Sequence, residues 1–216
     1  MNGIFSIPRC GVVIMARTTR SGERGAETSD ARPRGPRSNV RSWPLEFYVL
    51  SSGITDRTRE RVFSSLPTGS ASITWLPVAL DRFRKFRTIS HISQVTYARL
   101  LIPLVLPTWV SRVLYLDADL LVLGALAPLW EMDTDGSVLG AVADHGVNLL
   151  IDEGRASGLG VPQVRDYFNA GVLLIDLDQW RQKQISEIAL EYLERHPDSP
   201  YSDQDALNVA CDGQWK

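Results

Sequence analysis

Cysteine is nearly absent from this chain, whose 216 residues contain only Cys10 and Cys211. Two cysteines cannot form a disulfide framework, which excludes a small oxidised scaffold and makes a reducing compartment, the cytoplasm, the default expectation. No run reaches the ~20 apolar residues that a membrane span requires, and the richest, residues 100–106, contains Pro103. The three histidines show no metal-ligand spacing. With 44% hydrophobic residues, a globular chain is expected instead.

Charge is distributed unevenly. The formal net charge is −2, yet residues 1–41 carry a net +5 and the remainder a net −7. Residues 17–42 lack aromatic residues and contain Pro33 and Pro36 among Gly and Ser, a composition typical of disorder. The apolar run at 10–16 is too brief for a secretory signal. We expect residues 1–42 to be a disordered or atypical basic segment and residues 43–216 to fold. A nucleic-acid- or lipid-binding arm is the less favoured interpretation, and no nucleic-acid partner is expected.

Apolar runs alternate with helical patterns after residue 43. The runs predict strands over residues 45–50, 72–78, 112–117, 138–143 and 171–176. Three- and four-residue spacing and capping residues predict helices over 55–66, 94–106 with a break at Pro103, 179–195 and 203–210. Several runs are apolar throughout, as in strands that are buried on both faces. The expected fold class is α/β with a largely parallel sheet.

Asp117-Ala118-Asp119, directly after an apolar run, is the strongest chemical signal. In extended chain, residues i and i+2 face the same side with Cα atoms roughly 6–7 Å apart. Two carboxylates so placed can bind one hard cation and leave positions for water and phosphate oxygens, which suits Mg²⁺ or Mn²⁺ at a diphosphate. On this motif alone, solvated or turn-capping carboxylates are an equally weighted alternative.

Asn169-Ala170-Gly171 leads into the apolar run at 171–176. Asn169 offers a donor and an acceptor, which suits neighbouring sugar hydroxyls, and glycine allows close backbone approach. Taken alone, a turn before a strand is the favoured alternative.

Ser202-Asp203-Gln204-Asp205 opens the predicted helix at 203–210. Ser202 and Asp205 fit a capping box, which is a structural role. Asp203 and Gln204, in the first turn, are then free to face a site at the helix N-terminus.

Two isolated residues complete the candidates. Arg99 could meet a phosphate or a sugar hydroxyl, although in isolation a surface arginine is the better interpretation. Asp144 follows an apolar run, again at the end of a predicted strand. Cys211, within a predicted helix, is interpreted as a small buried hydrophobic residue.

Five segments, in this order and spacing, resemble glycosyltransferase family 8: YARLLIP, RVLYLDADLLVLG, AVAD, YFNAGVLLIDL and YSDQDALN. This family includes bacterial lipopolysaccharide galactosyl- and glucosyltransferases and is related to glycogenin. The resemblance covers about residues 44–216. It implies a GT-A fold with a mixed, mostly parallel sheet flanked by helices, a UDP-galactose or UDP-glucose donor, Mn²⁺ (or Mg²⁺), a saccharide acceptor and retention at the anomeric carbon.

The resemblance also implies roles for individual residues. Asp117 and Asp119 would bind the metal, and Ala118 would lie against the uridine ribose. The donor sugar hydroxyls would be held by Arg99, Asp144, Asn169 and Ala170. Asp203 and Gln204 would sit beside the anomeric centre. Because Gln204 is a poor nucleophile, front-face attack with Gln204 steadying oxocarbenium-like charge is favoured over covalent catalysis by Asp203.

The chain departs from the family pattern at both ends. The family normally opens with a strand and an acidic pair that binds uracil and ribose, where this chain has its arginine-rich segment. The family also continues to a His-x-x-Gly-x-x-Lys-Pro-Trp segment, whereas this chain ends at Trp215-Lys216. A partial GT-A domain is therefore expected, with weak or no activity. Peripheral contact with the inner face of the membrane is left open.

Two alternatives belong to other classes of protein. One is a non-catalytic remnant that binds a sugar nucleotide without turnover. The other is a haloacid-dehalogenase-type phosphatase, whose apolar strand also ends in Asp-x-Asp. Leu121 and the absence of a downstream lysine with a second acidic motif make the phosphatase the weaker hypothesis.

Overall fold

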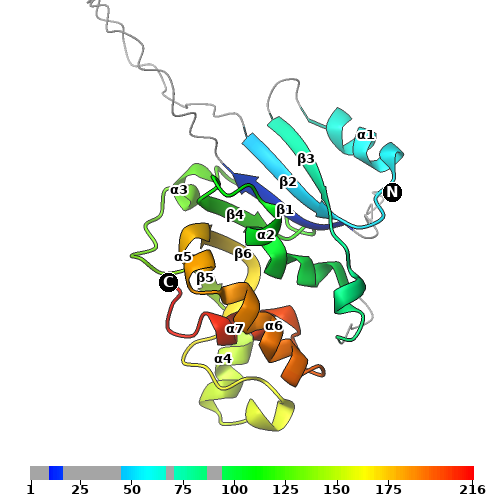
Figure 1. Ribbon diagram of the computed structural model, residues 1–216. Coiled ribbons are helices and arrows are strands. Elements are labelled where there is room, and N and C mark those ends of the chain that lie inside the picture. Colours follow the sequence, from blue (N-terminus) through cyan, green and yellow to red (C-terminus); the bar gives the residue numbers. More distant parts are fainter. Residues whose placement is uncertain (1–9, 17–44, 67–70, 87–93) are drawn as a thin grey trace, which may run out of the picture.

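The structure is a computed structural model that describes residues 10–16, 45–66, 71–86 and 94–216. Within that part of the chain, six strands form one sheet in the order β3-β2-β1-β4-β6-β5 (Figure 1). The strands are β1 (Cys10–Ala16), β2 (Leu45–Ser51), β3 (Ala71–Pro77), β4 (Arg112–Leu116), β5 (Leu139–Ala143) and β6 (Phe168–Asp176). The helices are α1 (Asp56–Ser64), η1 (Asp81–Phe83), η2 (Gln94–Leu101), α2 (Ile102–Val105), α3 (Ala127–Trp130), α4 (His145–Asp152), η3 (Ser157–Leu159), α5 (Leu177–Gln182), α6 (Ile185–Arg195) and α7 (Asp203–Ala210).

The sheet is mixed, and the expectation that it is largely parallel needs correction. Strands β2, β3, β4 and β5 run in one direction, but among the described pairs only β2–β3 is parallel, because β1 and β6 run the opposite way. An apolar run indicates a strand buried on both faces and carries no information about its direction. Direction depends on the connections between strands, which the pattern does not record.

Strand β1 was not predicted. Residues 10–16 fall within the segment 1–42 that is expected to be disordered or atypical, but they form a strand that pairs antiparallel with both β2 and β4. Val13 is the partner of Val49 on one side and of Leu116 on the other. Residues 17–42 lie outside the described residues, so the proposed boundary at residue 43 stays a prediction.

Two predicted helices are divided differently from expectation. The segment 94–106 forms 3₁₀ helix η2 and then the short α2, with Pro103 in the first turn of α2, where a proline needs no hydrogen bond from its nitrogen. The predicted helix 179–195 is split into α5 and α6 by Gln184, whose φ of 55° is left-handed. The apolar residues at three- and four-residue spacing, from Ile185 to Leu193, all lie in α6, whereas residues 179–184 contain only Trp180 as an apolar residue. The pattern therefore predicts α6 and carries little information about α5.

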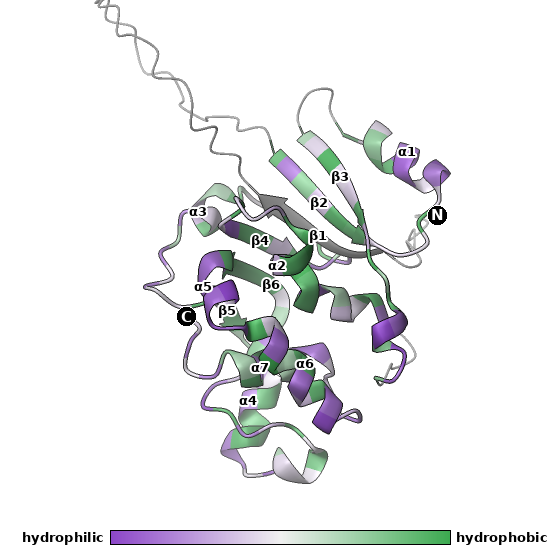
Figure 2. Ribbon diagram, viewed as in Figure 1, coloured by the Kyte–Doolittle hydropathy of each residue, from purple (hydrophilic) through white to green (hydrophobic). Residues whose placement is uncertain are grey.

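The main core lies between the sheet and a layer formed by η2, α2, α5, α6 and α7. Its largest fully buried side chains include Trp180, Tyr97, Tyr115 and Phe168. The opposite face of the sheet carries a smaller cluster around Leu114, Leu116 and Leu174. Figure 2 shows apolar residues concentrated on the strands and hydrophilic ones along α1 and the outer side of α6. Among the described residues, no helix has the length and apolar character needed to cross a membrane.

Candidate active site

The candidate site forms where β4 ends and β6 begins. The pairing of β4 with β6 starts at Leu116 and Val172, so the first residues of β6 extend past the end of β4. Asp117, the residue after β4, donates its backbone N–H to the Gly171 carbonyl at 2.9 Å. A Cβ added to Gly171 would lie 3.1 Å from Asp117 Oδ2, so glycine keeps space open beside that carboxylate.

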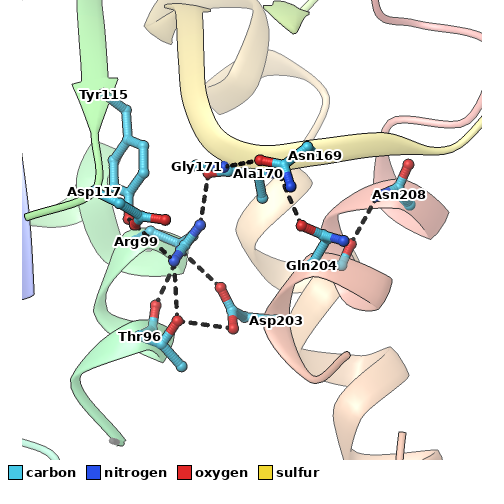
Figure 3. Close-up of polar contacts among 10 residues, drawn as sticks. All are labelled: Thr96, Arg99, Tyr115, Asp117, Asn169, Ala170, Gly171, Asp203, Gln204 and Asn208. Atoms are coloured by element: carbon cyan, nitrogen blue, oxygen red, sulfur yellow. Dashed lines mark hydrogen bonds and ion pairs between the residues drawn. The ribbon is translucent and has the colours of Figure 1, made fainter. Parts of the chain in front are cut away.

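We define the charge cluster as Thr96, Arg99, Tyr115, Asp117 and Asp203. Arg99 is buried, and its Nη2 donates to Asp117 Oδ1 at 3.0 Å. Its Nε lies 2.7 Å from Asp203 Oδ2 as an ion pair that is not aligned as a hydrogen bond. Figure 3 shows the guanidinium of Arg99 between the two carboxylates.

Neutral groups complete the charge cluster. Thr96 Oγ1 donates to Asp203 Oδ1 at 3.0 Å and accepts from Arg99 Nη2 at 3.0 Å. The Tyr115 hydroxyl donates to Asp117 Oδ1, and the Arg99 guanidinium lies 4.8 Å from the centre of the Tyr115 ring. Thr96 and Tyr115 were not predicted as site residues; their positions, three residues before Arg99 and two before Asp117, were the available signals.

Electrostatics couple the members of the charge cluster. Burial raises the pKa of Asp117, while Arg99 and the Tyr115 hydroxyl act in the opposite direction. Burial alone would lower the pKa of Arg99, but the surrounding acidic groups, Asp203 first, raise it overall, so Arg99 stays charged.

We define the amide cluster as Asp144, Asn148, Asn169, Gln204 and Asn208. Gln204 Oε1 accepts from the Ala170 N–H at 2.9 Å, and Gln204 Nε2 lies 3.4 Å from Asp144 Oδ2. Asn169 Nδ2 reaches the same Asp144 oxygen at 3.4 Å. Asp144 also caps α4 by accepting from the Val147 N–H.

Two asparagines hold the start of β6. Asn148 accepts from the Tyr167 N–H at 2.8 Å and donates to the Tyr167 carbonyl at 2.7 Å. Asn208 does the same for Phe168, at 2.8 and 2.9 Å. Neither asparagine was predicted as a site residue, and only the position of Asn208 within YSDQDALN was a signal.

The predicted capping box at α7 does not form. Ser202 occupies the cap position with a φ of 54°, but its side chain makes no capping bond and its buried Oγ has no partner among the described residues. Asp205 accepts instead from Tyr201 N–H, Ser199 Oγ and the Tyr167 hydroxyl. A left-handed cap directs the Ser202 side chain away from the helix N–H groups, which the sequence pattern does not reveal.

Most of the predicted site residues come together here. Hydrogen bonds or ion pairs link Arg99, Asp117, Asp144, Asn169, Ala170, Asp203 and Gln204. Ala118 and Asp119 instead lie exposed in the turn after β4. Asp119 is still near enough to act on the charges of Arg99 and Asp117.

A divalent cation fits part of this site. Asp117 Oδ1 is occupied by Arg99 and Tyr115, whereas Oδ2 has no hydrogen-bond donor among the described residues and faces the space kept open by Gly171. Asp119 is exposed nearby. Within the described part of the chain, no group of three or more His, Cys, Asp or Glu residues is arranged to hold a metal. The chain therefore offers two hard oxygen ligands here, which suits a cation that keeps water and phosphate in its other positions.

Comparison with known proteins gives one consistent family. The family model described as "Glycosyl transferase family 8" matches residues 27–216. General stress protein A of Bacillus subtilis (strain 168) is 30% identical over 175 residues, which cover 79% of this chain and 59% of that protein. Lipopolysaccharide 1,2-glucosyltransferase of Escherichia coli (strain K12) is 28% identical over 177 residues, covering 81% of this chain and 52% of that protein.

Solved structures agree. The crystal structure of the galactosyltransferase LgtC in complex with donor and acceptor sugar analogs is 38% identical, with a TM-score of 0.68 over 78% of this chain and 60% of that one. This likeness confirms the expected GT-A fold, of which the chain contains a part. The chain spans between half and three fifths of the length of these relatives.

Proposed function

This chain belongs to glycosyltransferase family 8, and from that premise we propose that it transfers a hexose, galactose or glucose, from a UDP-sugar to a saccharide acceptor with retention at the anomeric carbon. The observation that carries the proposal is that polar groups from five separate elements converge at one place. Groups from η2, the end of β4, the start of α4, the start of β6 and the first turn of α7 meet at one end of the sheet. Ligands of open α/β sheets bind at such an end.

The acidic pair supports a role in binding a diphosphate. Asp117, through its unoccupied Oδ2, and Asp119 would hold Mn²⁺ or Mg²⁺. Such a cation, when bound, offsets the negative charge that develops on the leaving diphosphate. Ala118, exposed between the two carboxylates, is proposed to lie against the ribose.

The polar groups beside β6 suit a hexose. Asp144 and Asn169 meet at one carboxylate oxygen, and the Asn169 side chain is exposed, so together they present donors and acceptors to sugar hydroxyls. Arg99 was expected to contact the sugar directly. Since its N–H groups are directed at Thr96, Ala170 and Asp117, we propose that it chiefly orders the site.

The contacts of Asp203 and Gln204 favour front-face attack. Asp203 is buried, with one oxygen bonded to Thr96 and the other paired with Arg99, which makes it a weak nucleophile. The Gln204 oxygen accepts from Ala170. In the proposed step the acceptor hydroxyl oxygen bonds to the anomeric carbon on the face that the diphosphate leaves. The carbon–oxygen bond to phosphate breaks, and the hydroxyl proton passes to the departing phosphate oxygen.

The acceptor is proposed to be a cell-envelope saccharide, because several relatives are named as lipopolysaccharide glucosyl- or galactosyltransferases. Such an acceptor would be met at the cytoplasmic face of the membrane, through peripheral contact.

The test is donor binding and hydrolysis by the purified chain with Mn²⁺ and a panel of UDP-sugars. We expect metal-dependent binding of UDP-galactose or UDP-glucose with slow UDP release, both lost in Asp117→Ala. The control is Asp178→Ala, which removes an exposed carboxylate on α5. Absence of both binding and release in the unmodified chain would contradict the proposal.

A binding-only remnant is the second candidate. Two observations favour it: Asp117 Oδ1 is already occupied by Arg99 and Tyr115, and the described residues supply only two candidate metal ligands. It predicts metal-dependent UDP binding without UDP release, even with an acceptor present, so the same assay separates the two functions.

A further inference from the structure

On the side away from β5, the start of β6 directs its backbone groups toward helices instead of toward a strand. Because the pairing with β4 begins only at Val172, Phe168 and Ala170 lie beyond the end of that neighbour. Along this edge, side chains supply the hydrogen-bond partners of the backbone. Asn208 bonds to both the N–H and the carbonyl of Phe168. Gln204 Oε1 accepts from the Ala170 N–H, and Arg99 Nη1 donates to the Ala170 carbonyl at 2.6 Å.

These contacts determine which end of the Gln204 amide faces the site. A backbone N–H can only donate, so the Gln204 atom beside the Ala170 N–H must be the oxygen. The amide nitrogen therefore points to Asp144 Oδ2, 3.4 Å away. In this arrangement Gln204 presents a hydrogen-bond donor to the site, and its oxygen is already in use.

Asn208 connects the two parts of this arrangement. Its side chain is 1% exposed, and its Nδ2 donates both to the Phe168 carbonyl and to the Gln204 carbonyl at 3.0 Å. One buried amide thus binds the start of β6 and the turn of α7 that carries Gln204. Figure 3 shows Asn208 beside Gln204 on α7, facing β6.

We propose that Asn208 is a positioning residue that holds Gln204 against Ala170, so that the Gln204 amide keeps its nitrogen directed at the site. The consequence for turnover rests on the proposed function, but the consequence for the Ala170 N–H does not. If Asn208 merely anchored Phe168, its loss would free the Phe168 N–H and leave the Ala170 N–H bonded to Gln204.

Asn148 provides a matched control. It makes the same pair of bonds, to the N–H and carbonyl of the adjacent Tyr167, but comes from α4. Its hydrogen bonds go to Tyr167, away from Gln204 and Ala170. Asn148→Ala therefore removes the same kind of backbone contact one residue away while keeping the Asn208 bonds to Phe168 and Gln204.

The experiment compares hydrogen exchange of individual amides in the unmodified chain, Asn208→Ala and Asn148→Ala. We expect the Ala170 amide to exchange about tenfold faster in Asn208→Ala and at the unmodified rate in Asn148→Ala. An unchanged Ala170 rate in Asn208→Ala, or an equal increase in both variants, would overturn the proposal. This readout needs no donor or acceptor, so it remains decisive if the chain proves inactive.

A second variant covers the case in which Asn208→Ala does not fold. Asn208→Asp keeps an oxygen for the Phe168 N–H but removes the amide donor to the Phe168 and Gln204 carbonyls, so the Ala170 amide should exchange faster while the Phe168 amide stays protected. Equal protection of both amides would count against the proposal. Where turnover is measurable, we expect kcat to fall about tenfold with KM for the UDP-sugar unchanged in either Asn208 variant. A rise in KM alone would contradict it.

Discussion

The charge cluster and the amide cluster meet at Ala170, where Arg99 holds the carbonyl and Gln204 holds the N–H. The two clusters rely on different forces. In the charge cluster, a buried guanidinium is shared between two carboxylates. In the amide cluster, the neutral amides of Asn148, Gln204 and Asn208 form directional bonds with the backbone at the start of β6. The charge cluster is held together mainly by ion pairs around a buried guanidinium. The amide cluster is held together mainly by hydrogen bonds of fixed direction.

This difference predicts how each cluster fails. Removing one member of a buried ion cluster leaves the others desolvated and unpaired, which costs more than the bond itself. Removing one neutral amide costs about 1 kcal/mol per hydrogen bond and shifts the position of the backbone. The charge cluster should therefore dominate stability, and the amide cluster should dominate alignment.

The largest effect is expected for Arg99→Ala. It leaves Asp117 and Asp203 without their counter-charge and should lower the free energy of unfolding by about 3–5 kcal/mol. Urea denaturation measures this. Arg195→Ala, which breaks an exposed pair with Glu191, should cost less than about 1 kcal/mol. Similar losses in the two variants would remove the distinction between the clusters.

Gln204→Ala should have a smaller effect on stability. It removes one bond to the Ala170 N–H and should cost about 1 kcal/mol in the same denaturation experiment. If the amide cluster governs the alignment of the site residues, the rate of UDP release should fall much further than a stability loss of about 1 kcal/mol would explain. A loss of stability as large as that of Arg99→Ala, with turnover preserved, would reverse the comparison.

Measuring stability as a function of pH tests the buried carboxyl group of Asp205, which lies beside the amide cluster. Burial raises the pKa of Asp205 above its ordinary value of 3.8. The folded chain then holds this proton to higher pH than the unfolded chain does, so stability should fall as pH rises from 3.8 through the raised value. The Tm of Asp205→Asn should decline less over that interval. Asp178→Asn, at an exposed position, is the control, and parallel Tm curves for all three proteins would be the contrary result.

The smallest stability effect is expected for Asp119→Asn. This carboxylate is exposed in the turn after β4, so the free energy of unfolding should change by no more than about 0.5 kcal/mol. Binding of Mn²⁺, followed by its paramagnetic broadening of nearby signals, should nevertheless weaken. Unchanged Mn²⁺ binding would remove Asp119 from the proposed metal site.

Much of the fold was predictable from local patterns. The apolar runs located β2 to β6, and the helix predicted over 55–66 contains α1. The clearest errors have physical causes that a local pattern does not contain. Cys10–Ala16 became β1 because β2 and β4 offer backbone partners on both sides, and the left-handed Gln184 divided one predicted helix into two.

The site shows the same division. The sequence by itself determined which groups stand at the ends of elements: Asp117 after β4, Asp144 after β5, Asn169 at the start of β6 and Gln204 in the first turn of α7. Only the tertiary structure decided what each group bonds to. It directed Arg99 to two carboxylates and a carbonyl, oriented the Gln204 amide, and gave Asn148 and Asn208 their roles. Local patterns reflect burial and backbone preference along one segment, whereas these bonds join segments distant in the chain and depend on where packing places them.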